Sequence, residues 1–406
     1  MSDSIATISP WPADLRVALV HDWLTGMRGG EKVLEMLCDF FPRATLFTIF
    51  HDRGAMSPII EGMEIRTSWI AKLPLADGHF RAYLPLFPRA IENFNFRKYD
   101  LIISTSHCVA KGAIPPAKAL HISYIHTPMR YVWEMYPHYL GKNAGAIKRL
   151  AGTALASYLR RWDVASCPRV HYFIANSENV RRRIQWHYRR EAEVIYPPVD
   201  GQLFRPSREP EDYFLIVTAL VPYKQVNLAI EAFNKLGSRL VVVGDGPDKK
   251  KLQAMAKDNI EFLPWQGADG LRDLYSGCRA LIFPGEEDFG IVPLEAQACG
   301  RPVIAYGRGG VLETVIPANP ESAAETTENR GEATGLFFYE SSAEALADAV
   351  RAFERHSFHP EAIRRQALRF DKPVFIRRLG DYLRTRIVEK FGDSVGWVPS
   401  GGDRDE

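Results

Sequence analysis

The sequence predicts an α/β protein made of two Rossmann-like, doubly wound domains. Short apolar runs of four to six residues, rich in Val and Ile, recur along the 406-residue chain, and amphipathic helical segments separate them. The runs are continuous rather than alternating, which is typical of strands covered on both faces. Strands that alternate with helices in this way predict parallel sheets.

Eleven segments predict strands, five before residue 205 and six after it: 16–23, 100–106, 120–127, 171–177, 193–198, 213–220, 239–246, 260–265, 280–285, 302–307 and 334–339. The segments 31–41 and 227–236 predict amphipathic helices between such strands, because their apolar residues fall on one helical face.

A polar, proline-containing stretch at 196–214 is typical of a linker. We therefore expect a first domain at 1–205 and a second at 206–371. Residues 372–395 predict a C-terminal amphipathic helix that packs back on the first domain, and 396–406 a flexible tail.

Composition narrows the class of protein. With 46% hydrophobic residues the chain is not disordered. No run approaches the ~20 apolar residues of a membrane span, and the first fifteen residues do not resemble a secretory signal. The five cysteines are widely spaced without a C-x-x-C pair, so we expect buried free thiols and no zinc site. These features predict a cytoplasmic protein.

Charge is divided unevenly along the chain. Residues 1–205 hold 26 basic against 18 acidic residues, and residues 206–406 hold 25 against 31. The split predicts that the first half faces something anionic, such as a phosphorylated ligand or lipid headgroups. No recognised nucleic-acid-binding motif accompanies it, so nucleic acid is not expected.

Ligands of open parallel sheets bind at the carboxyl ends of the strands, where helix N-termini favour anions. Two facing domains therefore predict one cleft between them. The loop 25–32 follows the first strand, and Gly26, Gly29 and Gly30 would let its backbone cradle an anion. A plain strand-to-helix turn is the alternative.

The segment 284–302 is the most informative part of the chain. Pro293 predicts a helix that begins around Val292, with Glu295 in its first turn and Glu287 in the loop before it. Carboxylates accept hydrogen bonds from sugar and ribose hydroxyls. Four backbone N–H groups are expected to meet a diphosphate: those of Phe289, Gly290, Ile291 and Val292. The alternative is that both acids are solvated and that Glu295 complements the helix dipole.

Two further loops carry candidate residues. Lys224, within 219–230, precedes a predicted helix and is suited to meet phosphate charge, although it is equally a surface lysine. His126, within 124–134, leaves a strand end and can hydrogen-bond a substrate; a structural histidine is the alternative.

Together these motifs resemble one family. The E-x7-E acids within FGIVPLEAQACGRPVIA, the PYK loop at 222–224, GDGP at 244–247, GRGGVLETV at 307–315 and IHTPMRYVW at 125–133 are similar to those of retaining, nucleotide-sugar-dependent family 4 glycosyltransferases. The resemblance spans about residues 15–390 and implies the two-domain GT-B fold. The HDWL–GG–EKVLE opening and HTPMRYVW most resemble mannosyltransferases of bacterial surface polysaccharides.

The resemblance implies a role for each candidate in the second domain. Glu287 would contact hydroxyls of the donor sugar, and Glu295 the ribose. Lys224 and the amides of 289–292 would hold the diphosphate, and Phe262 with Leu263 would border the nucleobase.

In the first domain, Gly29 and Gly30 would close over the diphosphate and His126 would lie near the sugar. One departure concerns the basic pair of the family, because Ala219 stands where an arginine commonly precedes the lysine. Arg28 or Arg130 are the candidates to compensate.

The implied activity is transfer of a sugar, mannose from GDP-mannose, to a saccharide acceptor that is lipid-linked, with retention and without a metal or cofactor. The D-x-D of Asp403 and Asp405 lies in the tail, away from the strand ends, and is discounted. A UDP-sugar-dependent enzyme and a non-catalytic nucleotide-sugar-binding protein remain alternatives; a dehydrogenase is disfavoured because no G-x-G-x-x-G follows the first strand.

Basic residues and apolar segments of the first half are compatible with peripheral association with an anionic membrane at its inner face, and ordinary surface and core packing explain them equally well. They are 69–75, 82–88, Lys148, Arg149, Arg160, Arg161 and Arg181 to Arg183.

Overall fold

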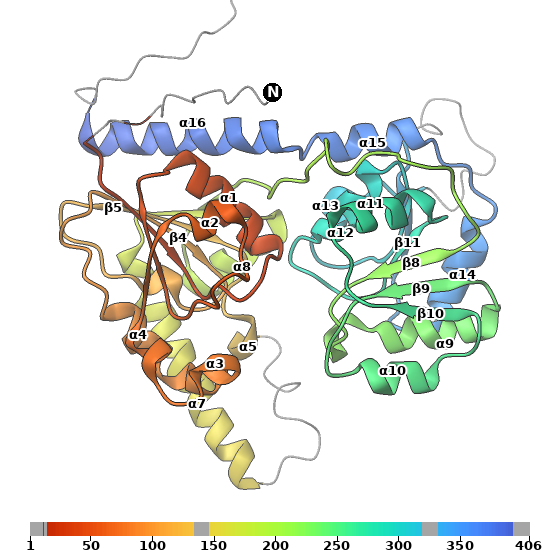
Figure 1. The fold of residues 1–406 in the computed structure, drawn as a ribbon, viewed down its shortest axis with the longest axis horizontal. Coiled ribbons are helices and arrows are strands. Elements are labelled where there is room, and N and C mark those ends of the chain that lie inside the picture. The colour runs from red at the N-terminus through yellow and green to blue at the C-terminus, as the bar shows by residue number, and fades with distance from the viewer. Residues whose placement is uncertain (1–10, 12–13, 134–145, 319–331, 393–406) are drawn as a thin grey trace, which may run out of the picture. The chain divides into compact units, whose positions relative to one another are not determined.

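A computed structural model describes residues 11, 14–133, 146–318 and 332–392 (Figure 1). Its contacts divide the chain into two compact units. The first comprises Met1–Asn176, Val180–Ile195 and Ile376–Glu406, and the second Ser177–Asn179 and Tyr196–Phe375. The main division therefore falls after residue 195, ten residues before the boundary expected from the linker composition. The expected tail 396–406 lies outside the described residues.

The first unit is built on a seven-stranded parallel sheet of order β3-β2-β1-β4-β5-β6-β7. The strands are β1 (Val17–His21), β2 (Thr45–Thr48), β3 (Glu64–Thr67), β4 (Leu101–Ser106), β5 (Leu120–Ile125), β6 (Tyr172–Ala175) and β7 (Ala192–Val194). The sequence prediction missed β2 and β3. Strand β3 is the edge strand and largely exposed, so it carries no continuous apolar run.

Helices cover both faces of this sheet and extend beyond one end of it (Figure 1). They are α1 (Gly29–Phe40), α2 (Pro58–Glu61), α3 (Ala76–His79), α4 (Phe87–Glu92), α5 (Arg130–Trp133), α7 (Ala146–Ala165) and α8 (Glu178–Tyr188), with the 3₁₀ turns η1 (Trp69–Lys72), η2 (Phe80–Leu86), η3 (Ala110–Gly112) and η4 (Cys167–Arg169).

The C-terminal helix α16 (Lys372–Phe391) belongs to the first unit from Ile376 onward. Its Leu379, Leu383 and Ile387 are buried, in keeping with the predicted amphipathic pattern. The Arg378 guanidinium donates to the Val194 carbonyl at 3.0 Å.

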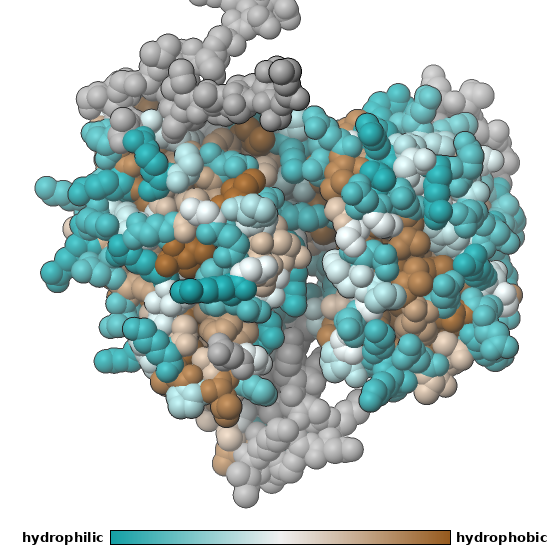
Figure 2. Space-filling view, in the orientation of Figure 1, coloured by the Kyte–Doolittle hydropathy of each residue, from teal (hydrophilic) through white to brown (hydrophobic). Residues whose placement is uncertain are grey.

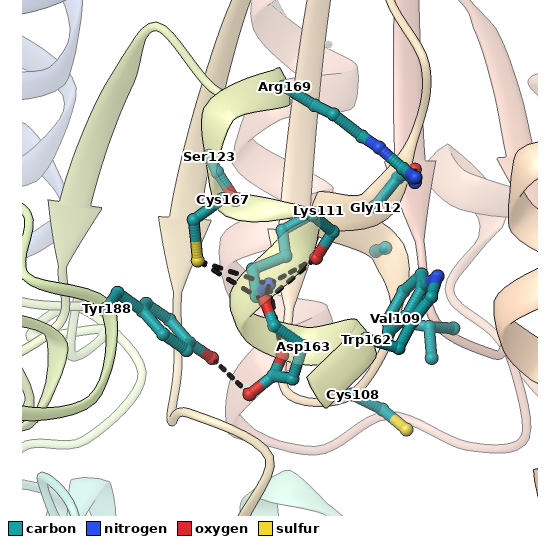
Figure 3. A network of polar contacts seen from close by, with 12 residues as sticks. Cys108, Val109, Lys111, Gly112, Ser123, Trp162, Asp163, Cys167, Arg169 and Tyr188 are labelled. Atoms are coloured by element: carbon teal, nitrogen blue, oxygen red, sulfur yellow. Dashed lines mark hydrogen bonds and ion pairs between the residues drawn. The ribbon is translucent and has the colours of Figure 1, made fainter. Parts of the chain in front are cut away.

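A buried ionic network joins four elements of the first unit (Figure 3). Lys111 of η3 is 1% exposed and pairs with Asp163 of α7 at 3.0 Å. The Tyr188 hydroxyl of α8 and the Trp133 indole N–H of α5 donate to the other oxygen of Asp163, at 3.0 and 2.8 Å. Because a buried charge is tolerated only when it is paired, these contacts fix the position of α7 against the sheet.

The second unit holds a six-stranded parallel sheet of order β10-β9-β8-β11-β12-β13. Its strands are β8 (Phe214–Val217), β9 (Leu240–Val243), β10 (Ile260–Leu263), β11 (Leu281–Phe283), β12 (Val303–Tyr306) and β13 (Gly335–Phe338). The helical elements are η5 (Pro222–Lys224), α9 (Val226–Leu236), α10 (Lys249–Met255), α11 (Ala268–Gly277), α12 (Ile291–Ala298), α13 (Val311–Thr314), α14 (Ala343–Phe353) and α15 (Pro360–Leu368). All eleven predicted strands are therefore present in the two sheets.

The second sheet is covered on both faces, as the continuous apolar runs predicted. Leu215 and Val217 of β8 enter one apolar cluster, and Phe214 and Ile216 enter another on the opposite face. All five cysteines are buried free thiols, which confirms that prediction. Within the described ranges, no helix combines the length and the apolar character that crossing a bilayer requires.

Candidate functional site

Two loops of the second unit bring opposite charges together at the carboxyl ends of its central strands. Lys224 ends η5 after β8, and Glu287 follows β11; their side chains form an ion pair and are 15% and 23% exposed. A Cβ on Gly285 would lie 3.0 Å from the Lys224 Cα, so the two loops pack backbone to backbone. The structure thus places two residues, chosen from separate motifs, in direct contact.

A third loop, after β12, contacts the backbone of Glu287. The Gly310 N–H donates to the Glu287 carbonyl at 2.9 Å, and Gly309 forms a bridge with Glu287. A Cβ on Gly310 would lie 2.4 Å from both the Asp288 carbonyl oxygen and the Phe289 Cα. The sequence analysis used this Gly-Gly pair only as part of the GRGGVLETV motif and missed its supporting role, which the two consecutive glycines after a buried strand could have signalled.

Helix α12 begins at Ile291, one residue before the expected start, and Pro293 is its third residue rather than its first. The difference arises at Gly290, which caps the helix with φ of 86° in the left-handed region that glycine enters at little cost. Within the described residues the N–H groups of Gly290, Ile291 and Val292 have no hydrogen-bond acceptor. Free donors at a helix N-terminus form an anion-binding site.

Glu295 is the fifth residue of α12, so its expected place in the first turn is wrong. The residue is 4% exposed, and its carboxylate accepts a hydrogen bond from the Tyr275 hydroxyl of α11 at 2.8 Å. Burial raises the pKa of Tyr275 well above its ordinary value, which keeps the hydroxyl a donor. The ribose contact of Glu295 stays a prediction.

Phe262 and Leu263 lie inside β10 and pack on opposite faces of the sheet. Leu263 packs against the cluster that contains Phe289, and Phe262 against the cluster under α9. Successive strand residues point to opposite faces, so the two side chains enter different apolar clusters. The contact of these residues with a nucleobase stays a prediction. Leu263 is the one on the face of the candidate site.

In the first unit, the structure brings the glycine loop and His126 together. Gly29 and Gly30 open α1, and a Cβ on Gly30 would lie 3.4 Å from the His126 Nε2. His126 follows β5, and its backbone N–H donates to the Ser106 carbonyl at 2.9 Å. Its Nε2 is buried and has no hydrogen-bond partner among the described residues. Burial, together with the neighbouring His107 and His21, lowers the pKa of His126 to about 3, so the imidazole is neutral at pH 7.

Sequence reasoning missed the polar residues that surround this histidine. The fully buried Asp22 accepts four consecutive backbone N–H groups, those of residues 107–110, at 2.6 to 2.9 Å. The Glu31 carboxylate lies 3.5 Å from the His21 Nε2. Burial alone would raise the pKa of Glu31, but hydrogen bonding to His21 and the charge of His21 and His107 outweigh it and hold the pKa at about 2. Asp22 directly after a buried strand was the available signal.

Arg28 and Arg130, the two candidates to replace the missing basic partner at Ala219, both lie in the first unit. Arg28 precedes α1, where its backbone N–H donates to Glu31 at 3.0 Å. Asp403 and Asp405 lie outside the described residues.

Two parallel-sheet α/β units define the GT-B class of protein, and the solved structures that resemble the chain agree. The sucrose-phosphate synthase of Thermosynechococcus elongatus matches with a TM-score of 0.67 at 17% identity, covering 92% of this chain and 100% of that one. Anabaena HepE in complex with UDP matches with a TM-score of 0.62 at 15% identity, covering 91% and 100%.

The chain belongs to the family 4 glycosyltransferases. Residues 27–203 match the family model "Glycosyltransferase Family 4", and residues 203–370 match "Glycosyl transferases group 1". This confirms the GT-B fold and the family expected from the E-x7-E, PYK and HTPMRYVW motifs.

Relatives of known name match over shorter segments. The D-inositol 3-phosphate glycosyltransferase of Mycobacterium avium (strain 104) is 30% identical over 163 residues, 34% of this chain and 38% of its own length. The O-antigen chain mannosyltransferase RfbU of Salmonella typhimurium is 32% identical over 159 residues, 36% of this chain and 44% of its own length. The matched segments span about half or less of these relatives.

Proposed function

We propose that this protein transfers a hexose, with retention and without a metal ion, from a nucleoside diphosphate sugar to a saccharide acceptor. The observation that carries the proposal is the contact between Lys224 and Glu287 beside the start of α12. Lys224 is suited to bind a phosphate, and Glu287 is suited to accept hydrogen bonds from sugar hydroxyls. Each residue follows a central strand of the same sheet.

The chemistry follows from where charge develops. Breaking the anomeric bond leaves a sugar with oxocarbenium character and a leaving group that gathers negative charge. Preorganised donors at the leaving group are the largest single contribution to such a step. Lys224 and the N–H groups of Gly290, Ile291 and Val292 supply such donors from the protein itself.

His126 is assigned to the same reaction as a neutral residue. A buried imidazole with a pKa of about 3 carries no charge near neutral pH. It therefore offers a hydrogen bond to a sugar hydroxyl rather than a cation to a phosphate. Gly29 and Gly30 are assigned to the diphosphate from the family resemblance, and the backbone of Gly30 lies against the His126 ring.

We take mannose from GDP-mannose as the donor and a lipid-linked saccharide as the acceptor. Support comes from the HDWL and HTPMRYVW segments and from the partial match to a relative named as an O-antigen chain mannosyltransferase. A UDP-sugar donor is the second candidate. A non-catalytic nucleotide-sugar-binding protein is the third, and Ala219 is the residue that favours it.

A panel of GDP- and UDP-sugars, with released nucleoside diphosphate as the readout, tests the proposal. Turnover of GDP-mannose is expected, and turnover of any donor excludes a non-catalytic protein. Glu287→Ala should abolish transfer without unfolding the chain, whereas the exposed neighbour variant Glu286→Ala should retain it. Wild-type transfer by Glu287→Ala would show that the site is assigned wrongly.

A further inference from the structure

The first unit contains an apolar cavity that the donor chemistry does not use. Its volume is about 300 Å³, and its walls come from η2, α4, α5, α7 and the residue Trp23 after β1. Leu84, Phe87, Leu155 and Leu159 are among its lining residues. Drug-sized ligands commonly bind in apolar cavities of this size.

The cavity has one cationic group. Arg81 is exposed and is the one charged residue among those that line the described part of the cavity. Its guanidinium stands over the rings of Trp23 and Phe80 at 5.7 and 4.8 Å. A cation at the edge of an apolar cavity complements a ligand with an anionic head and a hydrocarbon tail.

Exposed leucines occur on two of these elements and just before α3, which contacts η2. Leu86 ends η2 and is 40% exposed, Leu150 lies on α7 at 74%, and Leu75 precedes α3 at 78%. Leu75 also adopts φ of 58°, a left-handed conformation that is unfavourable for a residue with a bulky side chain. In Figure 2, hydrophobic residues gather on the part of the first unit where Figure 1 labels α3.

The left-handed conformation and the exposure of Leu75 both cost free energy, and a side chain that is 78% exposed gains little from packing inside the unit. Such outliers persist where they serve a function. Exposed apolar side chains next to basic ones suit a lipid surface, and Lys72 and Arg149 on the neighbouring η1 and α7 are exposed.

We propose that this cavity binds the hydrocarbon chain of a phosphate-bearing lipid, with Arg81 at the phosphate. The inference rests on the proposed function in one respect: the lipid is the carrier of the saccharide acceptor. At roughly 30 Å³ per methylene, similar to the volume of a liquid water, the cavity accommodates about ten carbons. The rest of a longer chain would lie along the exposed leucines.

Calorimetric titration of the full-length protein with hexyl, octyl and decyl phosphate, each below its micelle concentration, tests this directly. The Kd is expected to fall about fourfold per added methylene until the cavity is full. Inorganic phosphate should not bind measurably at the same concentrations. Equal affinity for all three chains, or for phosphate alone, would overturn the proposal and would point to a headgroup site.

Matched variants locate the binding. Leu155→Trp and Leu84→Trp fill the cavity from two walls and should weaken decyl phosphate more than tenfold. Ala154→Trp adds the same side chain at an exposed position of α7 that does not line the cavity, and should bind as the wild type does. Arg81→Gln should weaken decyl phosphate but not decyl maltoside, which has a neutral head.

Unchanged affinity in both filling variants would overturn the assignment to this cavity. If one variant fails to fold, the other and the chain-length series still decide. Binding of GDP-mannose to the same proteins, measured by calorimetry without lipid, separates this inference from the proposed function. Chain-length-dependent lipid binding by a protein that binds no nucleotide sugar would sustain the lipid site and contradict the proposed transferase.

Discussion

Gly310→Ala is expected to disable the site while leaving the unit folded. The new Cβ would lie 2.4 Å from the Asp288 carbonyl oxygen and from the Phe289 Cα, whereas ordinary contacts begin at 3.4 Å. The backbone torsion of Gly310 is already in the right-handed region, so the cost is steric rather than conformational. Backbone atoms cannot swing aside as a side chain can. The loop that carries Glu287 must therefore move by about 1 Å.

A displacement of that size at catalytic groups lowers the rate by roughly 100-fold. Overpacking should cost about 1 to 3 kcal/mol of stability, which leaves the unit folded. The assay is steady-state release of nucleoside diphosphate, together with urea unfolding. Gly380→Ala is the control, because its Cβ would meet Phe40 at an ordinary 3.7 Å inside α16. Wild-type turnover by Gly310→Ala would refute the claim that this loop positions Glu287.

Three further variants test the buried polar groups. Lys111→Met leaves Asp163 buried without its cation and should lower the free energy of unfolding by roughly 3 to 5 kcal/mol. Adding Asp163→Leu should restore part of that loss, and urea unfolding of both variants measures it. Since the pKa of His126 is about 3 when folded and near 6.5 when unfolded, the unfolded chain binds the extra proton between these values, so stability falls as pH drops through this window. His126→Asn should flatten that fall by up to about 1.4 kcal/mol per pH unit, measured by urea unfolding from pH 7 to 5. Tyr275→Phe removes the hydrogen bond to Glu295 and should cost about 1 to 3 kcal/mol; an unchanged unfolding midpoint would contradict it.

The sequence was most informative where burial alone decides the structure. Strands such as β8 and β9 are covered on both faces, so their continuous apolar runs reveal them without tertiary information. Strand β3 was not predicted because it lies at an edge of the sheet and faces solvent, where a strand needs no hydrophobic pattern. The domain boundary moved for a related reason: Val199 and Phe204, within the polar linker, are buried in a core cluster of the second unit.

Residues of the site were predictable by type more readily than by orientation. Lys224 and Glu287 could be chosen from their loops, but their direct contact depends on β8 and β11 being neighbours in the sheet, which sequence order does not reveal. Glu295 lies one residue further along α12 than expected, just beyond the first turn, because Gly290, not Pro293, determines where the helix starts. Asp22 was overlooked because its four partners lie about 85 residues further along the chain.

Ala219 alters how the proposed site would hold a diphosphate. With the family's arginine absent, Lys224 is the side-chain cation that the PYK loop contributes, and here Glu287 neutralises it. A diphosphate carries more negative charge than one carboxylate and competes for the same ammonium group, which would release Glu287 toward the sugar hydroxyls. The remaining attraction would come from the N–H groups at the start of α12. Those donors are fixed by the backbone and would need no reorganisation during the reaction. In the proposed reaction, the left-handed Gly290 that orients them would therefore carry a share of the stabilisation that the missing arginine would otherwise supply.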